Sequence, residues 1–235
     1  MEIPSLEFLN SSLSHCATVN ARRAVFRAEA YSCKAVSTDR KLYKKLETKY
    51  LCEMGCNSVE LSTSPGTTTD EEEWVKYHPT WRDTSFGPMT RSSARKTLFF
   101  LISVLNSVFP DYDFSEAQPE HFHRHQLRDV VSVINTNVIA HMKTTGSNDI
   151  ARQVWDALED SIKPKESEIY SYVPDSDNDP FTEDGGAWMF NFFFLNRKLK
   201  RIVFVSLHSV GNMTQMTTDE WLESSEEEMD IFNNE

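Results

Sequence analysis

The sequence predicts an α/β protein of the α+β type, with helices packed on a mostly antiparallel central sheet. Two observations lead to this fold class. Helix-like patterns fill the middle of the chain, whereas strand-like patterns cluster near both ends. Two consecutive apolar, aromatic-rich runs are also joined by the short turn Asn196-Arg197-Lys198, which indicates a β-hairpin. We therefore expect the strands to form one sheet and the helices to cover it.

Helices are expected where apolar residues recur at three- and four-residue steps: Pro4–Ser14, Asp39–Met54, Arg95–Phe109, Leu127–Met142 and Asn148–Ile162. The clearest of them is Arg95–Phe109. Ser92 or Ser93 is expected to cap its start and Pro110 to end it, because proline cannot continue the hydrogen bonding of a helix. Pro164 should end the last helix in the same way.

Strands are expected at Arg23–Tyr31, Ile169–Val173, Ala187–Leu195 and Leu199–Leu207. The first alternates apolar and charged residues, as a half-buried strand does. The third is apolar on both faces, which is typical of a central strand covered on both sides. A period of two places these side chains of the third strand on one face: Trp188, Phe190, Phe192 and Phe194. It places Met189, Phe193 and Leu195 on the other face.

Composition restricts the class of protein. A chain of 235 residues with 39% hydrophobic residues fits one medium domain, expected at 1–218, with unpacked appendages. The net charge of −12 argues against a protein that coats nucleic acid. There is no 18-residue apolar run and no secretory pattern. The four cysteines are expected to be reduced thiols, which favours the cytosol or the nucleus.

Two regions are expected to lie outside the packed domain. Residues 55–93 contain STSPGTTTDEEE and isolated aromatic residues without a period, which indicates a mobile linker. Residues 219–235 hold eight carboxylates, and no Lys or Arg follows Arg201. A segment with this charge and so few apolar residues is expected to be a disordered acidic tail.

Patterns that imitate metal sites are incomplete. Asp175-x-Asp177-x-Asp179 resembles the start of a calcium loop, but Pro180 stands where the loop needs Gly and Gly186 where it needs Glu. An Asp/Pro turn is the preferred interpretation. His121, His123 and His125 alternate, but no carboxylate or cysteine stands nearby at zinc-site spacing, so we expect a solvated turn. We predict neither a metal nor a cofactor.

A catalytic interpretation rests on one motif. Asp111-Tyr112-Asp113 imitates the nucleophile motif of haloacid-dehalogenase-like phosphatases, which lies at the end of a buried strand. Here it follows a helix that is ended by proline. No Gly-rich phosphate loop and no nucleophile elbow is present. A phosphatase built on Asp111 and Asp113 therefore remains an alternative to a protein without enzymatic activity, as does a general adaptor.

Three segments form an ordered set of motifs that covers about half the chain. The first is Glu29–Lys34, followed by Asp39, and the second runs from Arg95–Leu101 through Leu105-Asn106 to Pro110–Ser115. The third consists of Ile169–Tyr172, Pro174-Asp175, Asp179–Phe181, Trp188, Phe190–Phe194 and Asn196–Arg201. Together they resemble the signature boxes of the Maf-one repressors of RNA polymerase III.

This resemblance implies a monomeric negative regulator without catalytic activity. Such a protein binds RNA polymerase III near its clamp and prevents recruitment by the Brf-containing initiation factor, which represses tRNA and 5S rRNA genes. It has no sequence-specific contact with nucleic acid. Its nutrient and stress response runs through kinases of the TOR pathway and through phosphatases, and the protein shuttles between cytoplasm and nucleus. The chain departs from the family at Met189 and Val173, where Ser and Asn are common, and it has no long basic run in the linker.

Phosphorylation sites are expected where kinases find a charged or proline neighbour. Thr67, Thr68 and Thr69 each have a carboxylate three positions later, and so do Ser224 and Ser225. Ser64 precedes Pro65, and Ser93 follows Arg91 by two positions. Each phosphate would add about −1.5 to −2 charges.

The expected partner-binding residues are Arg197, Lys198, Lys200 and Arg201 of the hairpin turn, with Asp111, Tyr112 and Asp113 of the loop after the central helix. A hairpin turn must expose at least some of its cations. These cations can bind an acidic polymerase surface, hold the acidic tail or form part of a nuclear import signal, and the sequence favours none of the three. Most other motif residues are expected to form the core.

Overall fold

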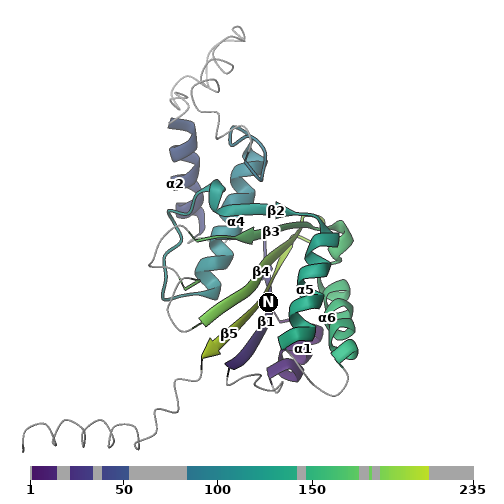
Figure 1. Ribbon diagram of the computed structural model, residues 1–235. Helices are drawn as coiled ribbons and strands as arrows, with labels where there is room; N and C mark the ends of the chain where they lie inside the picture. The colour runs from purple at the N-terminus through teal and green to yellow at the C-terminus, as the bar shows by residue number, and fades with distance from the viewer. Residues whose placement is uncertain are drawn as a thin grey trace, which may run out of the picture.

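The computed structural model describes residues 2–14, 22–33, 39–52, 84–141, 147–174, 180–181 and 186–211. These form one antiparallel sheet with helices on both faces (Figure 1). The strands follow the order β1-β5-β4-β3-β2. Their bounds are β1 Arg22–Ser32, β2 Phe122–His125, β3 Glu168–Tyr172, β4 Gly186–Asn196 and β5 Arg201–Gly211. The α+β prediction is confirmed, and every strand pair of the described sheet is antiparallel.

The helices divide between the two faces. One face is covered by α1 (Pro4–Ser14), α5 (Leu127–His141) and α6 (Ser147–Ser161), and the other by α2 (Asp39–Cys52) and α4 (Ser92–Val108). Two short 3₁₀ turns, η2 (Pro119–His121) and η3 (Pro164–Glu166), precede β2 and β3. The five helices of the described ranges lie within a few residues of the predicted ones. Along the described ranges, no helix has the length and apolar character needed to cross a membrane.

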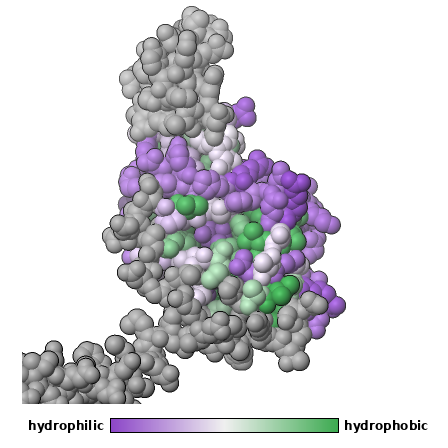
Figure 2. Space-filling view, viewed as in Figure 1, coloured by the Kyte–Doolittle hydropathy of each residue, from purple (hydrophilic) through white to green (hydrophobic). Residues whose placement is uncertain are grey.

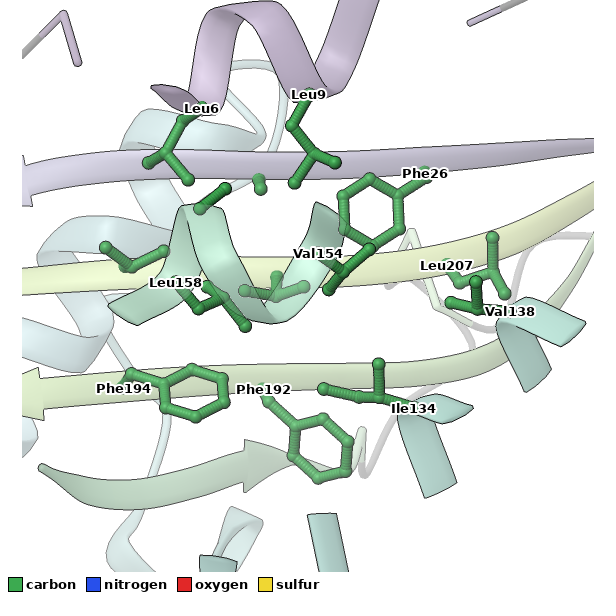
Figure 3. Packing of buried hydrophobic residues seen from close by; sticks show 14 of the residues in the cluster. Leu6, Leu9, Phe26, Ile134, Val138, Val154, Leu158, Phe192, Phe194 and Leu207 are labelled. Carbon is green, nitrogen blue, oxygen red and sulfur yellow. The ribbon is translucent and has the colours of Figure 1, made fainter. Parts of the chain in front are cut away.

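The apolar periodicity of each helix explains the face that it buries. On α1 the leucines at three- and four-residue spacing, Leu6, Leu9 and Leu13, are at most 3% exposed. Figure 3 shows Leu6 and Leu9 pointing toward the sheet, where side chains from α5 and α6 meet those of β4 and β5. Phe192 and Phe194 of β4 belong to this cluster, whereas Phe193 packs on the opposite face. As the middle strand of the sheet, β4 therefore buries both of its faces.

A β-bulge in β4 overturns part of the predicted face assignment. The pairing of β4 with β5 shifts between Trp188 and Phe190. One extra residue in a strand reverses the alternation on one side of it. Met189 therefore packs with the cluster of Phe190, while the Trp188 ring contacts Phe181 at a centroid distance of 4.5 Å on the other face. The strict period of two was wrong for these two residues.

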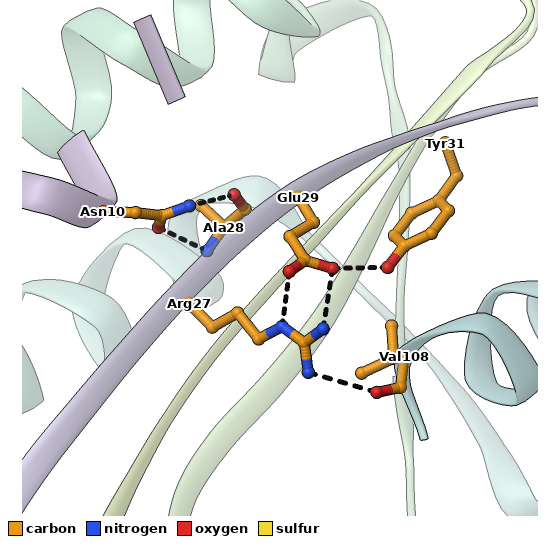
Figure 4. Close-up of polar contacts among 6 residues, drawn as sticks. All are labelled: Asn10, Arg27, Ala28, Glu29, Tyr31 and Val108. Carbon is orange, nitrogen blue, oxygen red and sulfur yellow. Dashed lines mark hydrogen bonds and ion pairs between the residues drawn. The ribbon is translucent and has the colours of Figure 1, made fainter. Parts of the chain in front are cut away.

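Asparagine side chains complete the hydrogen bonding of two strands. On the outer edge of β1, Asn10 donates to the carbonyl of Ala28 at 2.8 Å and accepts from its N–H at 2.9 Å (Figure 4). Asn191 does the same for Tyr172 of β3, at 2.9 and 2.7 Å. An unpaired backbone group at a strand edge would otherwise need water or another chain.

The structure corrects the predicted start of α4 and the end of the linker. Arg91, rather than Ser92 or Ser93, occupies the N-cap position, and its carbonyl accepts from the first-turn N–H groups. The predicted linker extends to residue 93, but residues 84–89 are partly or fully buried and residues 92–93 belong to α4. Met89 is fully buried, and the buried Arg95 donates to the carbonyls of Met89 and Thr90 at 2.7 and 2.6 Å. Residues 53–83 lie outside the described part of the chain.

The histidine segment is a strand rather than the predicted solvated turn. His123 and His125 belong to β2, which pairs with β3 at the edge of the sheet. Phe122 directs its ring into the core, and this anchor fixes the segment. The His125 ring forms a hydrogen bond of 2.7 Å with the Ser171 hydroxyl. Burial lowers the pKa of His125, and the charge of His123 adds to this effect.

Candidate interaction surface

The turn between β4 and β5 is built around a buried asparagine. Asn196 is fully buried, and its side-chain oxygen accepts from the N–H groups of Lys198 and Leu199 at 3.1 and 3.0 Å. Its amide nitrogen donates to the carbonyl of Ile162 at 2.9 Å. This arrangement folds residues 197–200 into a tight turn and ties the turn to the end of α6. Lys200 completes the turn with a φ of 51°.

Arg197 connects the turn to β3 and to α4. Its guanidinium forms two hydrogen bonds with the carboxylate of Glu168, at 3.0 and 2.9 Å. It also donates to the hydroxyl of Thr97 at 2.8 Å. The Glu168 carboxylate accepts a further bond from Tyr170 at 3.0 Å. Arg197 is therefore a half-exposed structural link between three elements, in addition to any role in binding.

The charges of this pair shift the pKa values of both partners. Burial alone would raise the pKa of Glu168, but the hydrogen bonds from Arg197 and Tyr170 outweigh it, and the pKa is lowered. The hydrogen bond to Glu168 raises the pKa of Arg197. Burial raises the pKa of the neighbouring Cys33 thiol to about 11, which the charge of Arg197 only partly opposes. The thiol is therefore protonated at neutral pH and a poor nucleophile.

The other three cations of the turn occupy different environments. Arg201 turns inward and donates to the carbonyl of Ser161. Lys198 projects outward, 81% exposed, and forms a 3.0 Å ion pair with Glu166. Lys200 is also exposed, while its carbonyl accepts from the N–H of Cys33 at 2.9 Å. Lys198 and Lys200 are thus the turn cations most open to a partner.

The loop after α4 brings Asp111 and Asp113 to the surface, with the Tyr112 ring half buried. Asp113 accepts from the N–H of Ser115 at 2.9 Å, and hydrogen bonds with Ser115 lower its pKa. The side chain of Asn106 accepts from the N–H of Phe114 at 2.8 Å and fixes the loop on α4. Asp113 therefore stabilises a turn.

The position of the Asp111–Asp113 loop differs from that of the phosphatase motif. The loop follows the C-terminus of α4, whereas the phosphatase motif requires the end of a buried strand. Within the described ranges, no group of three His, Cys, Asp or Glu side chains is placed to hold a metal ion. The predicted calcium-like segment at 175–179 lies outside the described residues.

The predicted phosphorylation sites lie mostly outside the described part of the chain. Ser64, Thr67, Thr68, Thr69, Ser224 and Ser225 lie outside the described residues. Ser93 is exposed in the first turn of α4, and its carbonyl accepts from Thr97 at 2.9 Å. A phosphate in the first turn of a helix is electrostatically favourable, because the helix dipole is positive there.

A second polar network joins β1 to the end of α4. The guanidinium of Arg27 forms a two-bond pair with Glu29, at 2.7 and 3.0 Å, and donates to the carbonyl of Val108 at 3.2 Å (Figure 4). Tyr31 donates to the same carboxylate. Burial and this hydrogen bond raise the pKa of Tyr31. The alternation of residues 27, 29 and 31 indicates that they share one face of the strand. It does not indicate that Arg27 would bond to the backbone carbonyl of Val108 at the end of α4.

The three sequence motifs thus meet in one unit. Arg197 of the third motif donates to Thr97 of the second, and the first motif is tied to Lys200 through Cys33. One face of the molecule has a mixed surface. Figure 2 shows hydrophilic side chains along its upper and right-hand borders and hydrophobic side chains in its middle.

Comparison with known proteins identifies the family to which this unit belongs. The Maf1 regulator family model matches residues 24–206, which include all three motifs. The chain belongs to the Maf1 regulator family. A relative from Schizosaccharomyces pombe, a repressor of RNA polymerase III transcription, is 30% identical over 90% of this chain and 82% of its own length. A Dictyostelium discoideum repressor of the same kind is 30% identical over 81% of this chain and 77% of its own.

Solved structures of the Maf1 family agree with this fold. A crystal structure of citrus MAF1 superimposes with a TM-score of 0.63 at 30% sequence identity, covering 90% of this chain and 99% of the citrus chain. A second crystal form gives a TM-score of 0.60. The resemblance found in the sequence motifs is therefore confirmed over most of the chain.

Proposed function

We propose that this protein represses transcription by RNA polymerase III, including that of tRNA and 5S rRNA genes. The observation that carries the proposal is the match of residues 24–206 to the Maf1 regulator family, together with two long relatives named as repressors of this polymerase. Repression acts through binding to the polymerase near its clamp, which blocks recruitment by the Brf-containing initiation factor. Phosphorylation and dephosphorylation control both this activity and the distribution between cytoplasm and nucleus.

The exposed end of the β4–β5 turn provides one part of the binding surface. Lys198 and Lys200 project from a turn that Asn196 and Arg197 hold rigidly. A rigid platform lowers the entropy lost on binding, and exposed cations accelerate association with an acidic partner. The loop Asp111–Ser115 offers a second candidate surface at the other end of α4.

Transcription of a tRNA gene with purified RNA polymerase III and its initiation factors tests the proposal. We expect repression when the protein is present at about the concentration of the polymerase. Charge reversal by Lys198→Glu and Lys200→Glu should weaken polymerase binding and repression without changing the fold, because both side chains lie outside the core. Lys163→Glu with Lys165→Glu is the matched control, since it makes the same charge change on the neighbouring η3 region.

The outcomes separate the functional classes. Full transcription at a tenfold excess of the folded protein would contradict the repressor proposal. Unchanged repression by the Lys198→Glu, Lys200→Glu variant would restrict the binding surface to other regions, beginning with Asp111–Ser115. Hydrolysis of a phosphate ester that is lost in Asp111→Asn would instead favour the phosphatase alternative. Capture of other proteins without any polymerase subunit would favour an adaptor.

A further inference from the structure

A hollow of about 350 Å³ lies between α2 and α4, outside the turn and the loop described above. Its apolar floor is aromatic. The Tyr43 ring meets Phe99 edge-on at a centroid distance of 5.5 Å, and Phe99 lies 5.3 Å from Phe100. Phe99 is buried, but Tyr43 and Phe100 are partly exposed. A floor of this kind can receive an apolar or aromatic side chain of a ligand.

Cations surround the aromatic floor. Arg40 and Lys44 come from α2 and Lys96 from α4, and all three are exposed. Within the described part of the chain, none of the three forms an ion pair with a carboxylate. Glu47 also lines the hollow, but its carboxylate lies 4.0 Å from the buried guanidinium of Arg95, which offsets its charge. The hollow is therefore a positive site on a chain whose net charge is −12.

This combination fits an acidic peptide that carries an aromatic side chain. Carboxylates complement the three cations, and an indole or phenyl ring complements the floor. Nucleic acid also combines charge with aromatic rings, but a net charge of −12 repels a polyanion from the molecule as a whole. A short acidic segment is the better match for one small hollow.

We propose that the segment Asp70-Glu71-Glu72-Glu73-Trp74 of the same chain binds in this hollow. It places four carboxylates directly before a tryptophan. The hollow lies between α2 and α4. The segment lies between the same two helices in the sequence, since α2 ends at Cys52 and α4 begins at Ser92. A ligand tethered on both sides to its own site has a high effective concentration.

The chain length permits this contact. Lys44 lies about 12 Å along α2 from Cys52, at 1.5 Å per residue. An unstructured chain from Cys52 to Asp70 would span roughly 20–25 Å. A second acidic run with a tryptophan, Asp219-Glu220-Trp221, follows β5, which does not contribute to the hollow. The segment at 70–74 is therefore favoured over the tail.

The contact would be sensitive to phosphorylation. Phosphates on Thr67, Thr68 or Thr69 would add negative charge directly before the bound carboxylates and strengthen their attraction to Arg40, Lys44 and Lys96. This inference does not depend on the proposed repression, because it concerns a contact within the chain.

Digestion of the full chain with a glutamate-specific protease tests the contact. A bound segment is cut only when it opens, so the cleavage rate reports the open fraction. Lys44→Glu with Lys96→Glu should accelerate cleavage after Glu71, Glu72 and Glu73 by about three- to tenfold, given the strength of exposed ion pairs. Cleavage after Glu226, Glu227 and Glu228 in the same sample should not change. Lys163→Glu with Lys165→Glu is the matched control and should leave both rates unchanged.

Three results would overturn the proposal. Equal cleavage at 71–73 in the wild type and in the Lys44→Glu, Lys96→Glu variant, with both melting at the same temperature, would show that the segment does not bind there. Faster cleavage in the tail alone would assign the hollow to residues 219–228. Binding of a single-stranded RNA oligonucleotide that the variant loses, with no change in cleavage, would assign it to nucleic acid.

Discussion

At the scale of single residues, the described structure separates cations that hold the fold from cations that are open to a partner. Arg197 and Arg201 belong to the first group, because they bond to Glu168, Thr97 and the carbonyl of Ser161. Lys198 and Lys200 belong to the second. A sequence of four cations in a turn does not reveal this division.

Arg197→Glu should lower the free energy of unfolding by about 1.5–3 kcal/mol, because it removes charged hydrogen bonds and places two carboxylates side by side. Lys198→Glu should change it by about 1 kcal/mol or less, since its ion pair with Glu166 is exposed. Urea unfolding of both variants measures the difference. Equal midpoints would show that the Arg197 bonds do not contribute to stability.

His208 makes stability depend on pH. Its ring stacks on Trp188 at a centroid distance of 4.5 Å, and burial, followed by the charge of Arg27, lowers its pKa. A group whose pKa is lower in the folded state takes up its proton more readily when unfolded. The contribution of neutral His208 to the free energy of unfolding is therefore complete above the unfolded pKa of about 6.5. It is lost as the pH falls below that value.

The pKa of His125 is lowered as well, so it adds to the same pH dependence. Replacing His208 with Phe should keep the stacked ring and reduce the loss of unfolding free energy between pH 7.5 and 5.5. His125→Gln serves as the comparison, and the double variant should show the smallest loss. A His208→Phe protein with the wild-type pH dependence would rule out His208 as a source.

At the scale of elements, the pairing of β3 with β4 depends on a side chain as well as on backbone hydrogen bonds. Backbone pairing between β3 and β4 covers residues 168–170 and 193–195. Asn191 then continues it by bonding to both backbone groups of Tyr172. The two strands could otherwise separate at this end, where the bulge at Trp188 and Phe190 also alters the pairing.

Asn191→Ala should lower the free energy of unfolding by about 2–3 kcal/mol, because it removes two hydrogen bonds to the backbone of the buried Tyr172. The amide of Tyr172 should also exchange its hydrogen faster. Asn137→Ala is the control, because in the described part of the chain that side chain donates to the carbonyl of Val133 in its own helix. A loss no larger than that of the control would contradict the proposed role of Asn191.

At the scale of the whole molecule, the N-terminal part is integrated into the sheet. β1 pairs with β5 along its whole length, from Arg22 with Gly211 to Ser32 with Arg201. α1 packs on one face and α2 on the other. The elements before residue 53 therefore complete a core whose remainder comes from beyond residue 83.

Cleavage at a protease site inserted after residue 60 should yield two fragments that remain associated. The paired strands and the buried leucines of α1 hold them together without a covalent link. Size-exclusion chromatography of the cleaved protein should give a single peak that contains both fragments. Separate peaks without denaturant would show that residues 1–60 are not part of the folded unit.

The sequence alone determined the fold class, the five described helices, the central hairpin and the family. Each of these rests on local periodicity, turn residues or ordered motifs, which the chain carries within short windows. The burial of Phe192, Phe193 and Phe194 on alternate faces follows in the same way. The strand order could not be read from these patterns, because periodicity shows which face is buried but not which strands are neighbours.

Only the tertiary structure decided the roles of individual polar residues. Whether Arg197 is free depends on Glu168 and Thr97, which lie 29 and 100 positions away in the chain. The bulge at Met189 depends on the register with β5, and the strand at His123 depends on pairing with β3. The bonding of Arg197, the bulge and the β2 strand are all set by contacts between distant segments. A local sequence pattern carries no information about the energies of such contacts.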